Sequence, residues 1–338
     1  MWQQVILVLG WILAAATPAA AAPDASAGSQ AAIEALTRAH AAVVGVRVTA
    51  SEGARSAQTL GQQRAGSGVV IGPDGLILTI GYLMLEADSI QIVTQDNRTL
   101  PARPVAYDVA TGFGLIRPLL TLRGVGAAPL GSNKDLPTGA ALMVATGGED
   151  AEVAITQLVS KRAFSGYWEY HIEDALFTSP PVGNHSGAAL FNQRGELLGI
   201  GSLFVGDALG APPRVPGNMF VPVDLLKPIL AEMQQTGSSK QSRRPWLGLT
   251  SAEQGGRVQV VRVTAGSPAQ LGGVESGDII LAVDEKRVAS LEEFYKGVWA
   301  RPNPDDEIKL TVLHGADVKV ITLRGVDRMT TMAKPAGI

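Results

Sequence analysis

The sequence predicts a mainly β chain with two successive domains, and three observations support this. From Val43 onward, short runs rich in Val, Ile and Leu alternate with segments rich in Gly, Pro, Asp and Asn, as in proteins built from many short strands and tight turns. Helices do not alternate regularly with these runs, so a β-barrel or sandwich is expected rather than a parallel sheet. A polar stretch from Gln234 to Arg244 separates a long first part from a short second part.

The composition limits the classes of function. A chain of 338 residues that is 46% hydrophobic and 17% charged has the composition of a folded protein, not a disordered one. The formal net charge of −3 and the lack of a long basic run argue against nucleic acid or an anionic membrane surface as a partner. The chain has no cysteine, which excludes disulfides, thiolate metal sites, a lipoprotein anchor and a cysteine nucleophile. We expect neither a cofactor nor a metal.

Residues 1–22 are expected to be a secretory signal peptide. An apolar run from Val5 to Ala16 is followed by small residues up to Ala22, which is the pattern of a cleaved signal, although Lys and Arg are missing from its start. We expect cleavage near Ala21 and a periplasmic or cell-envelope location. The alternative is an uncleaved anchor, since the run is barely long enough to span a membrane. Only then would the chain contact the membrane.

The elements of the first domain follow from the hydrophobic pattern. A helix is expected at residues 31–42, where the apolar side chains fall on one side. Turns are expected at residues 72–75 and 192–195, where Gly, Pro, Asp and Asn gather. A helix over residues 224–233, with Asp224 as its N-cap, closes the domain. Strands are expected at residues 43–48, 68–71, 76–80, 90–94, 142–145, 155–159, 188–191 and 197–200.

The second part has the pattern of a separate small β-rich domain. An amphipathic helix is expected at residues 291–300. Its strands are expected at residues 258–263, 279–283, 308–313 and 319–323.

Several segments of the first domain resemble the HtrA/Deg family of trypsin-like serine proteases. Residues 66–79, Gly-Ser-Gly-Val-Val-Ile-Gly-Pro-Asp-Gly-Leu-Ile-Leu-Thr, are similar to the family's first hairpin, which leads into the catalytic histidine. Further similar segments lie at residues 155–160, 186–192, 195–200 and 220–228. The resemblance implies a chymotrypsin-type double β-barrel over residues 31–234.

The C-terminal part resembles the family's PDZ domain, which implies a linker at residues 235–244 and a PDZ domain at 245–326. Trp246, Leu247, Gly248 and Leu249 match its carboxylate-binding loop. PDZ domains add a peptide C-terminus as a strand, and amides of this loop hold the carboxylate. The resemblance therefore implies unfolded or C-terminally exposed polypeptides as partners. Members of the family are trimers, which suggests a homotrimer.

The catalytic positions depart from the family pattern. A serine protease needs a serine oxygen, a histidine to take its proton and an acid to orient the histidine. By the resemblance, Ser186 retains the nucleophile position, Tyr82 replaces the histidine and Gly112 replaces the aspartate, whereas Asp108 matches a non-catalytic aspartate. A phenol with a pKa of about 10 is no base at neutral pH. We therefore expect the chain to be proteolytically inactive and Tyr82 to pack as a core residue.

The loop around the serine is also altered. The family's Gly-Asn-Ser-Gly-Gly-Pro-Leu is replaced by residues 183–190, Gly-Asn-His-Ser-Gly-Ala-Ala-Leu. A residue has been inserted or displaced in the oxyanion loop at Asn184 and His185, and a Gly-Pro pair has become Ala188-Ala189.

Three functions remain open on the sequence alone. The first is an inactive family member acting as a chaperone or adaptor in envelope protein quality control. The second is an active serine endopeptidase in which His185 or His171 acts as a rewired base on Ser186, although both histidines are expected to lie on the surface. The third is a structural scaffold of an envelope assembly. A metal site formed by His171, Glu173, Asp174 and His185 matches no known ligand spacing.

Overall fold

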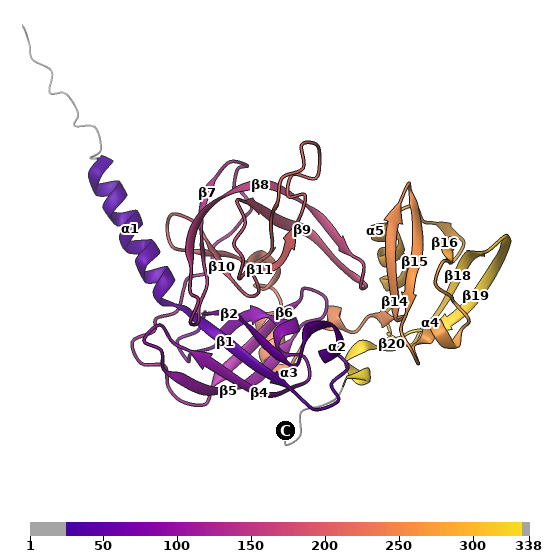
Figure 1. Cartoon of the computed structure of the whole chain (residues 1–338), viewed down its shortest axis with the longest axis horizontal. Helices are drawn as coiled ribbons and strands as arrows, with labels where there is room; N and C mark the ends of the chain where they lie inside the picture. Colours follow the sequence, from indigo (N-terminus) through magenta and orange to yellow (C-terminus); the bar gives the residue numbers. More distant parts are fainter. Residues whose placement is uncertain (1–24, 333–338) are drawn as a thin grey trace, which may run out of the picture.

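The computed structural model describes residues 25–332, with side chains from Gln30 onward (Figure 1). It contains two closed antiparallel β-barrels followed by a smaller domain built on an open antiparallel sheet. The predicted signal segment at residues 1–22 lies outside the described residues. Among the described helices, none has the length and apolarity needed to cross a membrane.

In the first barrel, the predicted hairpin of residues 66–79 forms the neighbouring strands β2 and β3. Its strands are, in barrel order, β1 (Val43–Ala50), β2 (Gln63–Val70), β3 (Ile77–Ile80), β6 (Phe113–Pro118), β5 (Thr99–Tyr107) and β4 (Ala87–Val93). Helix α2 (Ala57–Leu60) lies between β1 and β2, and the 3-10 helix η1 (Gly81–Met84) follows β3. β5 and β6 had no counterpart among the expected strands; β5 carries two prolines and has one fully buried residue.

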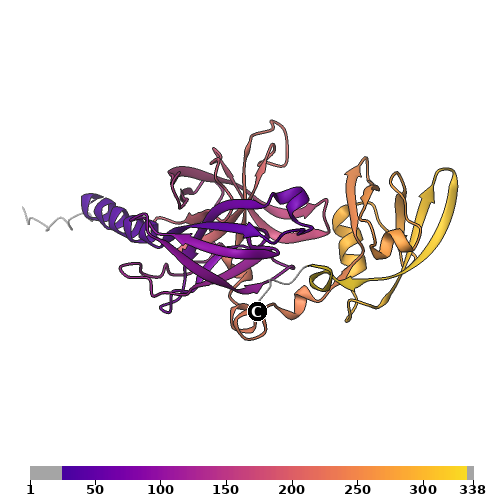
Figure 2. The same ribbon diagram turned by 60° about the horizontal axis from the view of Figure 1, so that its bottom comes forward.

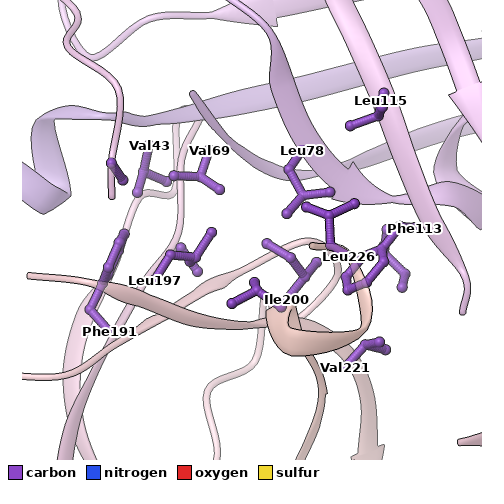
Figure 3. Close-up of a cluster of buried hydrophobic side chains, with 14 of the residues drawn as sticks. Val43, Val69, Leu78, Phe113, Leu115, Phe191, Leu197, Ile200, Val221 and Leu226 are labelled. Atoms are coloured by element: carbon purple, nitrogen blue, oxygen red, sulfur yellow. The ribbon is translucent and has the colours of Figure 1, made fainter. Parts of the chain in front are cut away.

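The second barrel carries the serine loop. Its strands are, in barrel order, β10 (Ala189–Phe191), β11 (Leu197–Val205), β12 (Gly217–Pro222), β9 (Tyr170–Ser179), β8 (Val153–Gly166) and β7 (Ala141–Ala145). Between the barrels lies one apolar core, in which Leu78 and Phe113 from the first barrel approach Ile200, Val221 and Leu226 from the second part of the domain (Figure 3). This packing places the turn after β3 close to the loop before β10.

The helices at the two ends of the domain differ from expectation. Helix α1 (Ala25–Ala41) begins earlier than predicted and projects from the barrels, at the end opposite to the smaller domain in both views (Figure 1, Figure 2). The expected single helix at 224–233 is wrong. The chain instead forms the 3-10 helix η2 (Val223–Leu225) and then α3 (Leu230–Thr236), because Pro228 has no N–H to continue a helix. The Asp224 carboxylate accepts from the Asn133 amide and pairs with Lys227, and does not cap α3.

The segment between the domains, residues 235–244, is bonded to the first barrel. It contains the 3-10 helix η3 (Lys240–Ser242). The hydroxyls of Ser239 and Ser242 each donate to the buried Asp108 carboxylate at 2.5 Å. The linker therefore has a defined path, set by a residue far away in the sequence.

The smaller domain is a sheet flanked by helices. The sheet runs β14 (Leu249–Gln254), β15 (Arg257–Val263), β16 (Ile279–Val283), β18 (Glu307–His314) and β19 (Asp317–Arg324), and β17 (Lys286–Arg287) pairs with β16. Helices α4 (Pro268–Leu271) and α5 (Leu291–Trp299) complete it, and η4 (Arg328–Thr331) follows it. β13 (Pro245–Trp246) pairs with β20 (Val326–Asp327), so the start and end of the domain lie side by side.

Candidate functional site

The loop that carries Ser186 is pinned between the two barrels. It joins β9 to β10, and the Ser67 amide of β2 donates to the Ser186 carbonyl at 2.8 Å. Gly187 has φ +76°, and a Cβ there would lie only 2.0 Å from the Ser67 carbonyl oxygen. Only glycine fits this close approach. The backbone therefore holds Ser186 at the junction of the barrels.

Tyr82 lies directly against Ser186. It belongs to η1, and its hydroxyl oxygen is 2.7 Å from Ser186 Oγ and 2.9 Å from the carbonyl oxygen of Ser202 on β11. Within residues 25–332, Tyr82 is the hydrogen-bond partner of the Ser186 side chain. Burial raises the pKa of Tyr82 to about 12, although the hydrogen bond with Ser186 opposes this. A phenol that keeps its own proton cannot remove the proton of Ser186. Tyr82 is half-buried and packs against the core between the barrels, but its hydroxyl belongs to the site.

Gly112 lies beside a second tyrosine. It has φ +83° in the turn between β5 and β6, and its carbonyl accepts from the Gly81 amide at 2.7 Å. A Cβ at this position would be 3.0 Å from the hydroxyl oxygen of Tyr170. Tyr170 itself donates to the Thr111 carbonyl at 2.7 Å, and burial raises its pKa. A side chain at position 112 would thus meet the neutral phenol of Tyr170.

The cavity left among these groups is small. Its volume is about 50 Å³, and its lining includes Tyr82, Gly112, Trp168, Tyr170 and Ser202. Such a cavity has room for roughly one or two water molecules, so it is no pocket for a substrate side chain.

Among the described residues, neither His185 nor His171 is hydrogen-bonded to the Ser186 side chain. The His185 ring has Nδ1 3.0 Å from the Gly183 carbonyl oxygen, and burial lowers its pKa. The His185 backbone amide also donates to Gly183, so this part of the expected oxyanion loop turns back on itself. Asn184 is exposed and reaches the Asp150 carbonyl at 3.4 Å.

His171 is buried, contrary to the expectation of a surface residue. It is 8% exposed on β9, with Nδ1 2.9 Å from Ser165 Oγ, because helix α5 of the smaller domain packs over this part of the hairpin. His171, Glu173 and Glu292 offer ligand atoms within 4.8 Å of one another. Lys296 Nζ already lies 2.8 Å from Glu173 and 2.7 Å from Glu292. The carboxylates are therefore balanced by a lysine, and any metal ion would have to displace it.

The loop expected to bind a peptide carboxylate holds a carboxylate of the same chain. The amides of Leu247, Gly248 and Leu249 donate to the Glu169 side chain at 2.9, 2.7 and 2.7 Å. Glu169 lies in the turn between β8 and β9, is 6% exposed and has φ +59°. Burial raises its pKa, although the three amides and Arg328 act in the opposite direction. The side chain of Trp246 lies elsewhere, in a groove of about 400 Å³ with Leu271 and Leu323 among its lining.

The neighbouring contacts extend this arrangement to strand β14 and helix α5 of the smaller domain. The Ser251 amide donates to the Tyr167 carbonyl at 2.9 Å. The Tyr295 hydroxyl of α5 donates to the Gly166 carbonyl at 2.7 Å and accepts from the Glu169 amide at 3.2 Å. Figure 1 shows the β8–β9 hairpin reaching from its barrel toward this domain.

Both parts of the chain match known domain families. Residues 66–200 match the trypsin-like peptidase domain, and residues 245–324 match the PDZ domain. The serine endoprotease DegS of Haemophilus influenzae is 26% identical over 261 residues, with 73% of each chain covered. The chain thus has a trypsin-like peptidase domain followed by a PDZ domain, and its relatives are HtrA/Deg proteases. The expected fold class, a mainly β chain with a trypsin-like double barrel and a PDZ domain, is confirmed.

Other HtrA/Deg proteins are similar over most of this chain. A probable periplasmic serine endoprotease, DegP-like, of Hahella chejuensis is 24% identical over 271 residues, which cover 75% of this chain. The chain spans about half the length of that relative, since 55% of it is covered. The solved structure of the HtrA-type protease AlgW with a decapeptide has a TM-score of 0.56 and 20% identity, with 90% of this chain and 99% of that chain covered. This likeness concerns the fold.

Two residues of the site were missed by sequence reasoning. Glu169 and Tyr170 lie between two aromatic residues and a histidine in the run Tyr-Trp-Glu-Tyr-His, which gives no sign that one side chain reaches a PDZ loop and the next reaches Gly112. The only available signal was the cluster of aromatic residues in a tight turn, which suggests a buried contact.

Proposed function

We propose that this HtrA/Deg protein is proteolytically inactive and binds polypeptide C-termini through its PDZ domain, as a chaperone or adaptor in protein quality control of the periplasm. The observation that carries the proposal is the contact between Ser186 Oγ and the Tyr82 phenol, where a serine protease needs an imidazole. We assign Tyr82 to the histidine position and Gly112 to the aspartate position. Unfolded or C-terminally exposed polypeptides are its partners, and a homotrimer is its proposed assembly.

The magnitude of the expected defect supports inactivity. Removing the base of a serine protease triad lowers turnover by on the order of 10⁶. The oxyanion hole could preserve part of the remaining rate. In this chain the loop that would carry the oxyanion amides is altered, since the His185 amide is bonded to Gly183 and Ala188-Ala189 stands in place of a Gly-Pro pair, so we do not expect this contribution to restore turnover.

Active-site labelling tests the proposal directly. We expect the mature chain to remain unlabelled by a fluorophosphonate probe, because Ser186 has no base to activate it. Casein should stay intact with wild type and with Ser186→Ala alike. Trypsin labelled in parallel shows that the probe is reactive.

Cleavage of casein that Ser186→Ala abolishes would instead identify an active endopeptidase. His185→Ala and His171→Ala would then show which histidine acts as the base.

N-terminal sequencing tests the proposed periplasmic location. The DegP-like relatives are named periplasmic, and residues 1–22 have a signal-like pattern. We expect N-terminal sequencing of protein from the envelope fraction to begin near Ala22. A sequence beginning at Met1 would contradict cleavage and support an anchored protein.

A scaffold without peptide binding is the remaining alternative. Peptide titrations with the full mature chain distinguish it from the proposed function, because a scaffold would show no preference for a free C-terminal carboxylate.

A further inference from the structure

We propose that the β8–β9 hairpin is an internal ligand of the PDZ domain, and that a polypeptide C-terminus binds only by displacing Glu169 from the carboxylate loop. The inference rests on the proposed peptide-binding function of this domain. It adds that a peptide must compete for the loop with a carboxylate of the same chain.

The first argument is the chemistry of the loop. A PDZ loop recognises a peptide terminus through backbone amides that converge on its two carboxylate oxygens. Here Gly248 and Leu249 both donate to Oε1 of Glu169, and Leu247 donates to Oε2. A side-chain carboxylate and a terminal carboxylate present the same two oxygens and the same charge. Glu169 therefore meets the recognition requirement of the loop.

The second argument is the main-chain pairing. A bound peptide adds as a strand, so one of its carbonyls accepts from the edge strand beside the loop. The Tyr167 carbonyl, two residues before Glu169, accepts from the Ser251 amide of β14. In addition, Tyr295 of α5 binds the backbone of Gly166 and Glu169. Residues 166–169 thus contact the carboxylate loop, the edge strand β14 and helix α5 of the PDZ domain.

The third argument is exclusion. Glu169 is 6% exposed, so an incoming carboxylate cannot reach the loop amides while this side chain occupies them. Two carboxylates sharing the same amides would also repel each other. Binding of a peptide therefore requires the hairpin tip to leave.

The hairpin can leave the carboxylate loop because its other contacts with the PDZ domain include an exposed ion pair. Glu173 and Lys296 form an ion pair whose side chains are 59% and 48% exposed, and such pairs stabilise little. The hairpin is nevertheless tethered, so it competes as an intramolecular ligand at high effective concentration. We expect this to weaken the apparent affinity for peptides by about tenfold or more, since only the fraction of molecules with a free loop binds.

The test compares the full mature chain with Glu169→Gln, which keeps the size of the side chain and its backbone conformation but removes the charge. Asp174→Asn is the matched control, because Asp174 is an exposed carboxylate on the same hairpin. The probe is a fluorescein-labelled heptapeptide that ends in an apolar residue with a free carboxylate, titrated by fluorescence anisotropy. A C-terminally amidated peptide of the same sequence checks that binding depends on the carboxylate. Hydrogen exchange of the segment containing Leu247–Leu249 is measured without peptide.

The expected result is binding about tenfold tighter or more for Glu169→Gln than for wild type and Asp174→Asn, with no binding of the amidated peptide. Equal affinities for wild type and Glu169→Gln would overturn the internal-ligand inference and leave the proposed peptide binding intact. If no variant binds peptide, the proposed function fails, and displacement of Glu169 by a peptide fails with it. Hydrogen exchange then tests only whether Glu169 occupies the loop: faster exchange in Glu169→Gln would support that contact, and unchanged exchange would overturn it.

Discussion

Asp108→Asn is expected to lower the free energy of unfolding by about 3 kcal/mol, because hydrogen bonds to a buried charged group each contribute roughly 1.5–3 kcal/mol. Asp108 is fully buried. Its Oδ2 accepts from the amide and hydroxyl of Thr111, and its Oδ1 accepts from Ser239 and Ser242. Asparagine keeps one oxygen but turns an NH₂ group toward donors on the other side. At least one set of donors then loses its acceptor.

Protonation of the same carboxylate should lower the free energy of unfolding in acid. Burial acts to raise the pKa of Asp108, but the hydrogen bonds from Ser239, Ser242 and Thr111 outweigh it, so the pKa lies below its ordinary value. A lowered pKa in the folded state stabilises the fold above the unfolded pKa of about 4, and this contribution is lost as the pH falls through the folded pKa. The wild type should therefore lose stability below about pH 4 more steeply than Asp108→Asn.

Urea denaturation followed by circular dichroism measures both effects. Asp88→Asn is the matched control, since Asp88 is exposed on β4 of the same barrel, and it should unfold at the wild-type urea concentration. Hydrogen exchange at residues 239–242 should rise in Asp108→Asn alone, because the linker has lost its acceptor. An unchanged midpoint for Asp108→Asn would show that the buried carboxylate does not stabilise the domain.

Restoring two triad residues is expected to cost stability without restoring catalysis. Gly112→Asp puts a side chain at φ +83°, with its Cβ 3.0 Å from the Tyr170 hydroxyl oxygen. Backbone strain and overpacking together should destabilise the fold by about 2–4 kcal/mol. Tyr82→His combined with Gly112→Asp should therefore leave casein uncleaved.

Two comparisons separate the causes of the destabilisation. Gly124 has φ +77° with nothing within 4 Å of a Cβ, so Gly124→Asp measures the backbone strain alone. Adding Tyr170→Phe to Gly112→Asp removes the crowding oxygen and should recover part of the lost stability. If Gly112→Asp costs no more than Gly124→Asp, Tyr170 does not fill the acid position.

The serine loop must change as well before cleavage returns. Ala188 and Ala189 are fully buried, and the His185 amide is bonded to Gly183. Deleting His185 and introducing Ala188→Gly with Ala189→Pro, in the background of Tyr82→His and Gly112→Asp, is the smallest set that we expect to give casein cleavage. The reason is that oxyanion-hole amides must point at the developing charge. Cleavage by the double variant alone would show that the loop is already competent.

The hydrophobic pattern predicted most strands correctly, because strands such as β1, β3 and β10 are buried almost throughout and therefore appear as short apolar runs bounded by turn residues. β1, β3 and β16 begin within one residue of their expected positions or at them. β5, with its two prolines, and β9, which is interrupted by the exposed Glu173 and Asp174, carry little of that signal. Their strand conformation depends on partners from elsewhere in the sequence.

The sequence by itself determined the two-domain β fold, and it led to the proposals that residues 247–249 form a carboxylate-binding loop and that Tyr82 replaces a base near Ser186. Each of these depends on residues that are close in sequence and keep a recognisable order. Only the tertiary structure decided that Glu169 fills that loop, that Tyr170 fills the space beside Gly112, and that Asp108 holds the linker. All three contacts join residues 59 or more positions apart, and they form between separately patterned domains or elements. No local periodicity encodes them, because they arise only when the barrels and the PDZ domain pack against one another.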